Sequence, residues 1–516
     1  MTVKILLLCA FFAVMIAIGM YTRRHASDVD GYVLGSRSVG PWISAFAYGT
    51  SYFSAVVFVG YAGQFGWKYG IASTWIGLGN AFIGSLMAWF ILGRRTRVMT
   101  QHMNAKTMPD YFGKRYDSEA LKIAASVITF IFLIPYTASV YNGLSRLFGM
   151  AFDVPYSVCL IVMAILTGIY VILGGYMATA LNDFIQGIFM LFGICAVIYA
   201  VLNGQGGFFN ALSLLAAQTP ADGEVVKVAG YGIFASFFGP DPMNLLGVII
   251  LTSLGTWGLP QMVGKFYAIK DEKAVKTGMI VSTFFAVVVA GGCYFLGGFG
   301  RLFSAQIDIA AGGYDSIIPT MLSTLSDVLI GIVIVLVLSA SMSTLSSLVL
   351  TSSSTLTIDF LGSTVMKKAD EKKQVLLMRI FVVVFVVISV IIALNKDSIP
   401  NIAQLMGYSW GALAGAFLAP FLYGLYSKKV TRLSVWVSFG FSLIVTVTNM
   451  MFGYIKSPIN AGAIVMLVSL VLVPLVSFVT PKMDSSKTDE MFACLEEYVE
   501  VPASEALASK MEATAK

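Results

Sequence analysis

Long apolar runs alternate with short polar segments along most of the chain. An uncharged run of 18 residues or more is typical of a membrane-spanning helix, because about 20 residues cross the bilayer core. We count thirteen such runs and predict that each forms a transmembrane helix. They cover 4–22, 42–66, 71–93, 119–148, 153–175, 179–202, 240–263, 276–300, 325–360, 374–395, 400–426, 431–453 and 461–480.

Small and polar residues interrupt the second and the seventh of these runs where the bilayer centre should lie. Gly and Pro weaken a helix, so both runs are expected to break there. The residues that mark the breaks are Gly49, Gly255, Gly258 and Pro260. Two spans broken at corresponding places, five spans apart, are typical of an inverted-repeat transporter with its binding site at the midplane. The two repeats are expected at about 42–202 and 240–426.

The ninth run carries an unusual number of hydroxyl side chains. With a period of 3.6 residues, one face of this helix presents Ala340, Ser343, Thr344, Ser347 and Thr351, which we call the hydroxyl stripe. A hard cation such as sodium binds several neutral oxygens, which such a stripe provides. Small hydroxyl residues also allow close packing between membrane helices. The stripe alone leaves both interpretations open.

The composition agrees with a membrane protein. Of the 516 residues, 58% are hydrophobic and 12% are charged, whereas soluble domains carry about 25% charged residues. Most of the 33 Lys and Arg residues fall on one side of the membrane if the N-terminus is outside. We therefore predict a plasma-membrane protein with its N-terminus outside and its C-terminus in the cytoplasm. This asymmetry explains the net charge of +6 without nucleic acid. Residues 1–480 would form one transmembrane domain, and residues 481–516 an acidic cytoplasmic tail.

Few ionisable residues lie inside the predicted spans. Asp183 opens the sixth span, where it is either an N-cap or a station for a cation on its way to the cytoplasm. The spans contain no His/Asp/Glu relay and no glycine-rich phosphate loop, so we do not expect an enzyme. A channel would need polar residues along several spans, and a membrane sensor would need a signalling domain. Both are weaker alternatives to a transporter.

Several short motifs resemble the sodium:solute symporter family over about residues 30–430. They are the stretch from Gly31 to Ser38, Leu181-Asn182-Asp183 followed by Gln186, Gly258-Leu259-Pro260, and Met342-Ser343-Thr344-Leu345. The resemblance implies an all-α polytopic membrane protein. Its core would be leucine-transporter-like, with five plus five inverted helices. One extra N-terminal helix and two extra C-terminal helices would give 13 transmembrane helices.

The resemblance also implies where sodium (Na⁺) and the substrate bind. The implied sodium ligands are the carbonyls of Thr50, Phe53 and Ala340 and the hydroxyls of Ser343 and Thr344. Asp183 matches an acidic residue on the family's sodium exit route. Tyr52 stands where the family's proline carrier has an aspartate, and Tyr136 matches a substrate-facing tyrosine. The substrate-binding residues are expected to be Tyr52, Tyr136, Thr252, Thr256 and Trp257, with Trp257 as a lid beside the second break.

The function that follows is sodium-coupled import of a small organic solute by alternating access. Thr252 and Thr256 replace a tryptophan and a tyrosine of the proline carrier, so the solute stays open. It would be an amino acid such as proline, or a small carboxylate such as pantothenate or a monocarboxylate. A sugar or sialic acid is the alternative within the same fold. The expected partners are this solute, sodium and the lipid bilayer, and a single copy of the chain is sufficient.

Overall fold

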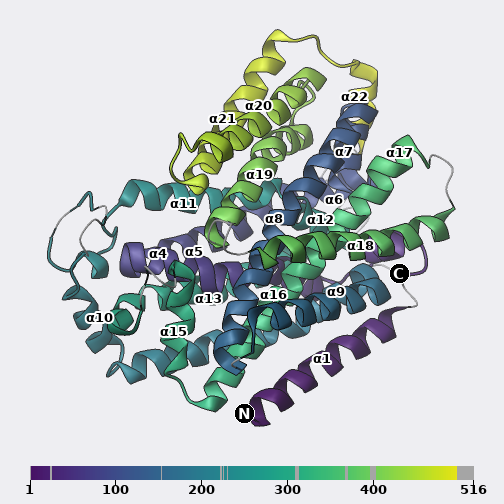
Figure 1. The fold of residues 1–516 in the computed structure, drawn as a ribbon. Coiled ribbons are helices and arrows are strands. Elements are labelled where there is room, and N and C mark those ends of the chain that lie inside the picture. The colour runs from purple at the N-terminus through teal and green to yellow at the C-terminus, as the bar shows by residue number, and fades with distance from the viewer. Residues whose placement is uncertain are drawn as a thin grey trace, which may run out of the picture.

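The computed structural model consists of helices packed side by side (Figure 1). It describes residues 2–23, 26–152, 154–220, 224, 226–228, 230–307, 309, 313–366, 370–395 and 402–496, and only the backbone of 2–4, 170 and 496. Within these residues no β-strand forms, and Val39 and Ile269 pair as an isolated bridge.

The regular helices are numbered along the chain. The first half holds α1 (Thr2–Thr22), α2 (Val29–Leu34), α3 (Pro41–Tyr52), α4 (Ala62–Tyr69), α5 (Thr74–Gly79), α6 (Arg94–His102), α7 (Met108–Arg115), α8 (Glu119–Phe152), α9 (Tyr156–Gly204) and α10 (Phe208–Ala216). The second half holds α11 (Pro242–Leu254), α12 (Pro260–Tyr267), α13 (Glu272–Gly297), α15 (Ile317–Ser323), α16 (Asp327–Ser354), α17 (Gly362–Thr364), α18 (Glu371–Leu394), α19 (Ile402–Tyr426), α20 (Arg432–Phe452), α21 (Pro458–Val479) and α22 (Ser485–Glu496).

Tighter or wider turns connect several of these helices. The 3-10 turns are η2 (Gly35–Arg37), η4 (Gly70–Ser73), η7 (Ile233–Ala235), η8 (Gly255–Gly258), η9 (Gly300–Gln306) and η10 (Tyr314–Ser316). The π-helical segments are η3 (Val56–Tyr61), η5 (Asn80–Met87), η6 (Trp89–Gly93) and η11 (Thr355–Leu361).

Ten helical segments of the described chain are long and apolar enough to cross a membrane, and an eleventh is the bent pair of α11–η8 and α12. The prediction of many membrane-spanning helices is therefore confirmed, whereas the count of thirteen stays a prediction. Two segments account for most of the difference. Val56–His102 is 47 residues long, which is about 70 Å at 1.5 Å per residue and more than twice a bilayer core. Gly70 interrupts it with a φ of 61°.

The second such segment is α9, whose 49 residues are two helices joined by a kink at Gly175. Gly175 has φ 54° and ψ −146°, a backbone conformation that glycine adopts readily because it lacks a Cβ atom. The kink lies at the end of the predicted span 153–175, just before the predicted span 179–202.

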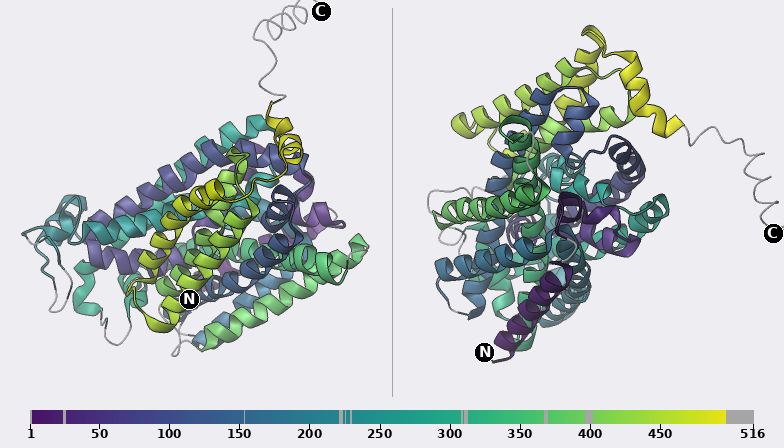
Figure 2. Two further views of the ribbon diagram at one scale, coloured as in Figure 1. Left: turned by 90° about the horizontal axis from the view of Figure 1, so that it is seen from above. Right: turned by 90° about the vertical axis from the view of Figure 1, so that its right-hand side faces the viewer.

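Burial separates a central group of helices from a peripheral one. In the central helices α16 and α19, 78% and 83% of the apolar 18-residue stretch is buried inside the protein. The buried share is only 22% in α1 and 33% in α18 and in α20. In Figure 1 and in the right-hand view of Figure 2, α1 lies along one edge of the molecule and α20 and α21 lie at the opposite edge. Exposed apolar side chains on these peripheral helices suit contact with lipid.

The central helix α16 packs against α9, α8, α1, α18 and α3. Its hydroxyl stripe is therefore surrounded by protein: Ser343 and Thr344 are fully buried and Ser347 nearly so. The burial of Ala340, Ser343, Thr344 and Ser347 excludes lipid contact at these four residues, which would have contradicted a cation site, whereas Thr351 is half-buried.

Candidate functional site

The first break lies between α3 and η3. Helix α3 ends at Tyr52, because Phe53 has the extended dihedrals φ −111° and ψ 134°, and the chain becomes helical again at Ala55. The whole turn is buried. An extended residue at this depth removes carbonyl oxygens from the helical hydrogen-bond pattern, so they need other partners.

The hydroxyl stripe of α16 supplies those partners. Three carbonyl oxygens surround the hydroxyl of Thr344, at 3.0 Å (Phe53), 3.1 Å (Ala340) and 3.4 Å (Ser51). Beside it, Ser343 Oγ donates to Thr50 Oγ1 over 2.8 Å. A hydroxyl has one proton to donate, so it cannot satisfy three carbonyls at once. The structure thus brings the five predicted residues into one cluster rich in neutral oxygens. Thr50 joins it through its hydroxyl, whereas its carbonyl accepts from Phe53 N at 3.2 Å, and Ser51 supplies the third carbonyl at Thr344.

The same contact contains three serines that the prediction did not include among the ligands. Ser51 Oγ and Ser347 Oγ are 2.9 Å apart, and Ser341 Oγ accepts from the backbone nitrogen of Ala55 over 3.1 Å. Ser347 belongs to the hydroxyl stripe, and Ser51 lies in the polar stretch of the second run. The density of hydroxyls in both stretches was the available signal for this contact.

Gly49 does not mark the first break, so that prediction is wrong. Gly49 lies within α3, and the break begins at Phe53. A Cβ atom at position 49 would come within 2.7 Å of Phe285 Cδ1. The glycine is therefore explained by close packing against α13 rather than by loss of helix.

The second break separates α11 from α12, as predicted. Gly255 to Gly258 form the 3-10 turn η8, Leu259 is extended, and Pro260 starts α12, which gives a bend of 46°. A Cβ atom at Gly258 would lie 2.8 Å from Leu418 N and 2.9 Å from Ala414 Cα. Backbone of α19 therefore covers this break.

Two predicted substrate residues at the second break bond to neighbouring backbone. Thr256 Oγ1 donates to Ser253 O at 2.9 Å, with Gly84 O at 3.3 Å, and Trp257 Nε1 donates to Ile83 O over 3.0 Å. Among the described aromatic pairs, Trp257 has none with Tyr52 or Tyr136. The structure therefore brings Thr256 and Trp257 to η5 and does not bring Trp257 over the other predicted substrate residues.

The remaining predicted substrate residues gather around Trp410, which the sequence analysis missed. Tyr52 stacks on Trp410 with ring centroids 6.2 Å apart, and Tyr136 meets it edge-on at 5.8 Å. The Tyr52 hydroxyl donates to the carbonyl of Thr252, whose own hydroxyl donates to Val248 O over 2.8 Å. Trp410 lies among small residues, Ser409 and Gly411, and this pattern could have identified it.

Two polar atoms of this aromatic cluster have no hydrogen-bond partner within the part of the chain that the structure describes. They are Tyr136 Oη and Trp410 Nε1, both on fully buried side chains. A buried donor without a partner is costly, by about 1–3 kcal/mol. The Tyr136 hydroxyl lies near the side chains of Ser54 and Trp410, so this cluster gathers buried polar groups that a polar ligand could contact.

Asp183 lies inside α9, past the kink at Gly175, and is fully buried. It is therefore not an N-cap. Its Oδ2 atom is 3.2 Å from Lys265 Nζ, and its carboxyl also lies near the Ser343 hydroxyl. The predicted exit-route residue thus lies beside the candidate sodium ligands.

A second group of charges holds the far end of α16 in place, beyond the hydroxyl stripe. Thr107 Oγ1 donates to Asp359 over 2.5 Å, and Asp110 forms ion pairs with Lys122 at 2.8 Å and Lys114 at 2.9 Å. Burial raises the pKa of Asp110, but the two ammonium groups outweigh it and hold that pKa below its ordinary value. This cluster ties η11 to α7 and α8.

The chain matches curated transporters over most of their length. It is 28% identical over 487 residues to the osmoregulated proline transporter OpuE of Bacillus subtilis, covering 91% of this chain and 96% of the relative. It is 30% identical over 440 residues to the sodium/proline symporter of Staphylococcus aureus, covering 83% and 82%. The corresponding protein of Salmonella typhimurium is 27% identical over 432 residues, with 82% and 83% covered.

Solved structures show the same fold. A Na⁺-coupled sialic acid symporter superimposes with a TM-score of 0.72 at 15% identity, covering 93% of this chain and 99% of the other. Mhp1, a nucleobase-cation-symport-1 family transporter, gives a TM-score of 0.53 at 13% identity, with 89% and 97% covered. Both have the leucine-transporter fold, which confirms the predicted fold class.

The family assignment rests on a match along the sequence itself. The model of the sodium:solute symporter family matches residues 32–439, which include both breaks, the hydroxyl stripe and Asp183. Members of this family are sodium-coupled transporters and not enzymes, as predicted. The chain belongs to the sodium:solute symporter family and is a multi-pass membrane symporter that couples sodium to the transport of a small solute.

Proposed function

We propose that this symporter imports a small solute bearing a carboxylate, with one sodium ion held between the first break and α16. The observation that carries the proposal is the cluster around Thr344, where the carbonyl oxygens of Ser51, Phe53 and Ala340 face one hydroxyl. The proposed sodium ligands are the carbonyls of Thr50, Phe53 and Ala340 and the hydroxyls of Ser343 and Thr344. Five neutral oxygens suit a hard monovalent cation.

The solute is proposed to bind at the aromatic cluster of Tyr52, Tyr136 and Trp410, with Thr252 and Thr256 close to the second break. The buried hydroxyl of Tyr136 and the indole N–H of Trp410 are hydrogen-bond donors, which supports a ligand that accepts hydrogen bonds, as a carboxylate does. Several curated relatives carry proline, so proline is the first candidate. A short monocarboxylate or pantothenate shares the same recognition chemistry.

The proposed topology places the N-terminus outside and the C-terminus in the cytoplasm of a plasma-membrane protein. The proposed transmembrane domain is 1–480, with repeats at about 42–202 and 240–426. The asymmetry of Lys and Arg supports this orientation. One sodium crossing 100 mV provides about 2.3 kcal/mol, and a tenfold gradient adds about 1.4 kcal/mol. The sum supports roughly 500-fold accumulation of a zwitterion such as proline, which carries no net charge, so one ion is sufficient for such a solute.

The test is uptake into proteoliposomes that contain the purified protein. Amino acids including proline, short monocarboxylates, pantothenate, sugars and sialic acid are compared under an inward sodium gradient and under a matched potassium gradient. We expect accumulation of one carboxylate class with sodium, and its loss when a sodium ionophore is added. Accumulation of a neutral sugar alone, or equal uptake with potassium, would contradict the proposal.

A further inference from the structure

A buried ion pair lies next to the candidate sodium ligands. Lys265 Nζ on α12 is 3.2 Å from Asp183 Oδ2 on α9, and the two side chains are 4% and 0% exposed. The ammonium group also lies 5.2 Å from the centre of the Tyr176 ring. Charged side chains inside membrane proteins are costly, and those that occur usually serve function.

The carboxylate of Asp183 has a different neighbour on each side. The Ser343 hydroxyl lies near it on the side of the candidate sodium ligands. Its Oδ1 atom has no hydrogen-bond partner among the described residues. Within the described part of the chain, Lys265 is the one residue that forms an ion pair with Asp183, and it contacts only the Oδ2 atom.

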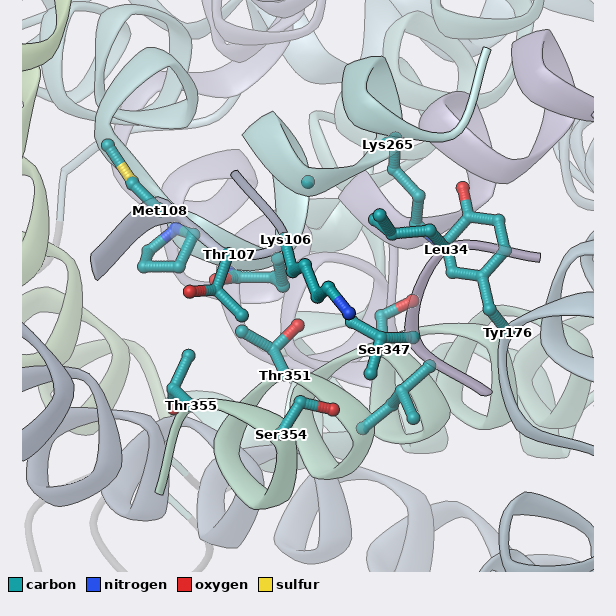
Figure 3. Close-up of a pocket in the computed structure, with 15 residues that line it drawn as sticks. Leu34, Lys106, Thr107, Met108, Tyr176, Lys265, Ser347, Thr351, Ser354 and Thr355 are labelled. Carbon is teal, nitrogen blue, oxygen red and sulfur yellow. The ribbon is translucent and has the colours of Figure 1, made fainter. Parts of the chain in front are cut away.

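Lys265 also lines a cavity of about 50 Å³, which has room for one or a few water molecules. Figure 3 shows Lys265 on one side of this cavity and Ser347, Thr351 and Ser354 of α16 on another. Ser347 is one helical turn from Ser343, so the cavity continues the face that carries the candidate sodium ligands. Lys265 therefore contacts Asp183 and also lines the cavity.

A second lysine provides a comparison within the same cavity. Lys106 also lines it, but its Nζ pairs with Asp30 Oδ1 over 2.9 Å, and that carboxyl is 49% exposed. Solvent screens such a pair, whereas Asp183 is fully buried and Lys265 is its ion-pair partner among the residues that the structure describes. The two lysines therefore contribute equal charge to the cavity but face different carboxylates.

We propose that Lys265 and sodium compete for Asp183, so that Lys265 replaces sodium as its counter-charge when the ion leaves. This inference rests on the proposed sodium site. A cation at Ser343 and the ammonium group of Lys265 are both attracted to one carboxylate and repel each other. Lys265 thus weakens sodium binding where release is needed. It also leaves the empty carrier electrically neutral at this point, so that it can return for another cycle.

The direct test replaces Lys265 by methionine and measures sodium activation of solute transport in proteoliposomes. Measurements at pH 8.5 minimise competition by protons. We expect Lys265→Met to lower the sodium concentration for half-maximal activation by about tenfold, a common size for coupling between two sites. Net uptake should fall at least about fivefold, because sodium is released slowly. Exchange of internal for external solute should persist, because exchange does not require the empty carrier to return.

Three further variants separate this role from a structural one. Lys265→Arg keeps the charge and should retain net uptake, and Lys106→Met should leave sodium activation unchanged. The double variant Asp183→Asn/Lys265→Met removes both charges, which avoids a lone buried carboxylate. The double variant should need a higher sodium concentration for half-maximal activation than Lys265→Met does.

The outcomes distinguish this inference from the proposed function. If the unmodified protein shows no sodium-dependent uptake, the proposed function fails before any variant is compared. If it does, and folded Lys265→Met protein requires as much sodium as the unmodified protein or more, the competition proposal is overturned. An equal decrease in the sodium concentration for half-maximal activation in Lys106→Met would also overturn it. The effect would then come from any positive charge at the cavity and not from the contact of Lys265 with Asp183.

Discussion

The two broken helices differ in what covers them. At the first break, carbonyl oxygens of Ser51 and Phe53 face the hydroxyls of α16 at 3.0–3.4 Å. At the second, Gly258 lies so close to α19 that an added Cβ would meet Leu418 N at 2.8 Å. Nearby, the indole nitrogen of Trp257 is held by a backbone carbonyl. The first break thus presents carbonyl oxygens to a buried hydroxyl, whereas the second is covered by backbone of α19.

The difference shows that a break in a membrane helix is not by itself a cation site. Both breaks carry Gly, Ser and Thr in the sequence, and both remove residues from the helical hydrogen-bond pattern. The partner helix decides the outcome, because α16 brings oxygen atoms and α19 brings small residues. We therefore expect variants at the first break to change sodium dependence, and variants at the second to change packing.

The largest effect is expected from Ser343→Ala/Thr344→Ala. The double variant removes two of the five proposed ligands, each worth about 1–1.5 kcal/mol, so sodium activation should weaken by roughly 100-fold or vanish. Sodium-dependent uptake in proteoliposomes measures it. The control is Ser353→Ala on the same helix, whose hydroxyl donates only to Leu350 O of its own helix, at 3.1 Å. Equal sodium activation in the double variant and the control would contradict the proposed sodium site.

A smaller effect, on stability, is expected from Gly258→Ala at the second break. The added methyl group meets backbone atoms of α19 that cannot turn aside, which typically costs about 1–3 kcal/mol. Thermal unfolding in detergent should occur at a lower temperature. Half-maximal sodium activation in the folded fraction should stay within about twofold. Gly264→Ala on α12 is the matched control, since among the described residues no atom outside its own helical turn lies within 4 Å of its added Cβ. A large change in sodium affinity for Gly258→Ala would contradict the proposed difference between the two helix breaks.

The smallest effect is expected from Thr256→Val. Its hydroxyl donates to Ser253 O at 2.9 Å, and removing this donor should destabilise the protein by about 1 kcal/mol. Sodium activation should remain unchanged, as measured by uptake over a range of sodium concentrations. Thr448→Val on the peripheral helix α20, whose hydroxyl also bonds to its own helix at 2.6 Å, is the comparison. A loss of sodium affinity specific to Thr256→Val would connect the second break to the ion.

Local sequence patterns predicted much of the fold and part of the site. Apolar runs reveal membrane helices directly, and the hydroxyl stripe is visible because residues three and four apart share a helix face. The partner of that stripe, the extended Phe53, followed only from family resemblance. Gly49 was misinterpreted because a glycine used for close packing against Phe285 looks, in sequence, like a glycine that ends a helix.

Contacts between segments that are distant in the chain could not be predicted from the sequence. Asp183 and Lys265 are 82 residues apart, and nothing near Asp183 indicates that a lysine on α12 neutralises it. Trp410 likewise joins Tyr52 and Tyr136 only through the packing of α19 against the core. Such pairings depend on the relative placement of helices, which local periodicity does not encode.

Direct binding of radioactive sodium to the purified protein tests the central claim, that the first break and α16 hold the ion together. Binding is measured over a range of sodium concentrations for the unmodified protein, Ser343→Ala/Thr344→Ala and Ser353→Ala. We predict saturable binding to the unmodified protein and to Ser353→Ala, and roughly 100-fold weaker binding to the double variant. Undiminished sodium binding by folded double-variant protein would contradict the account.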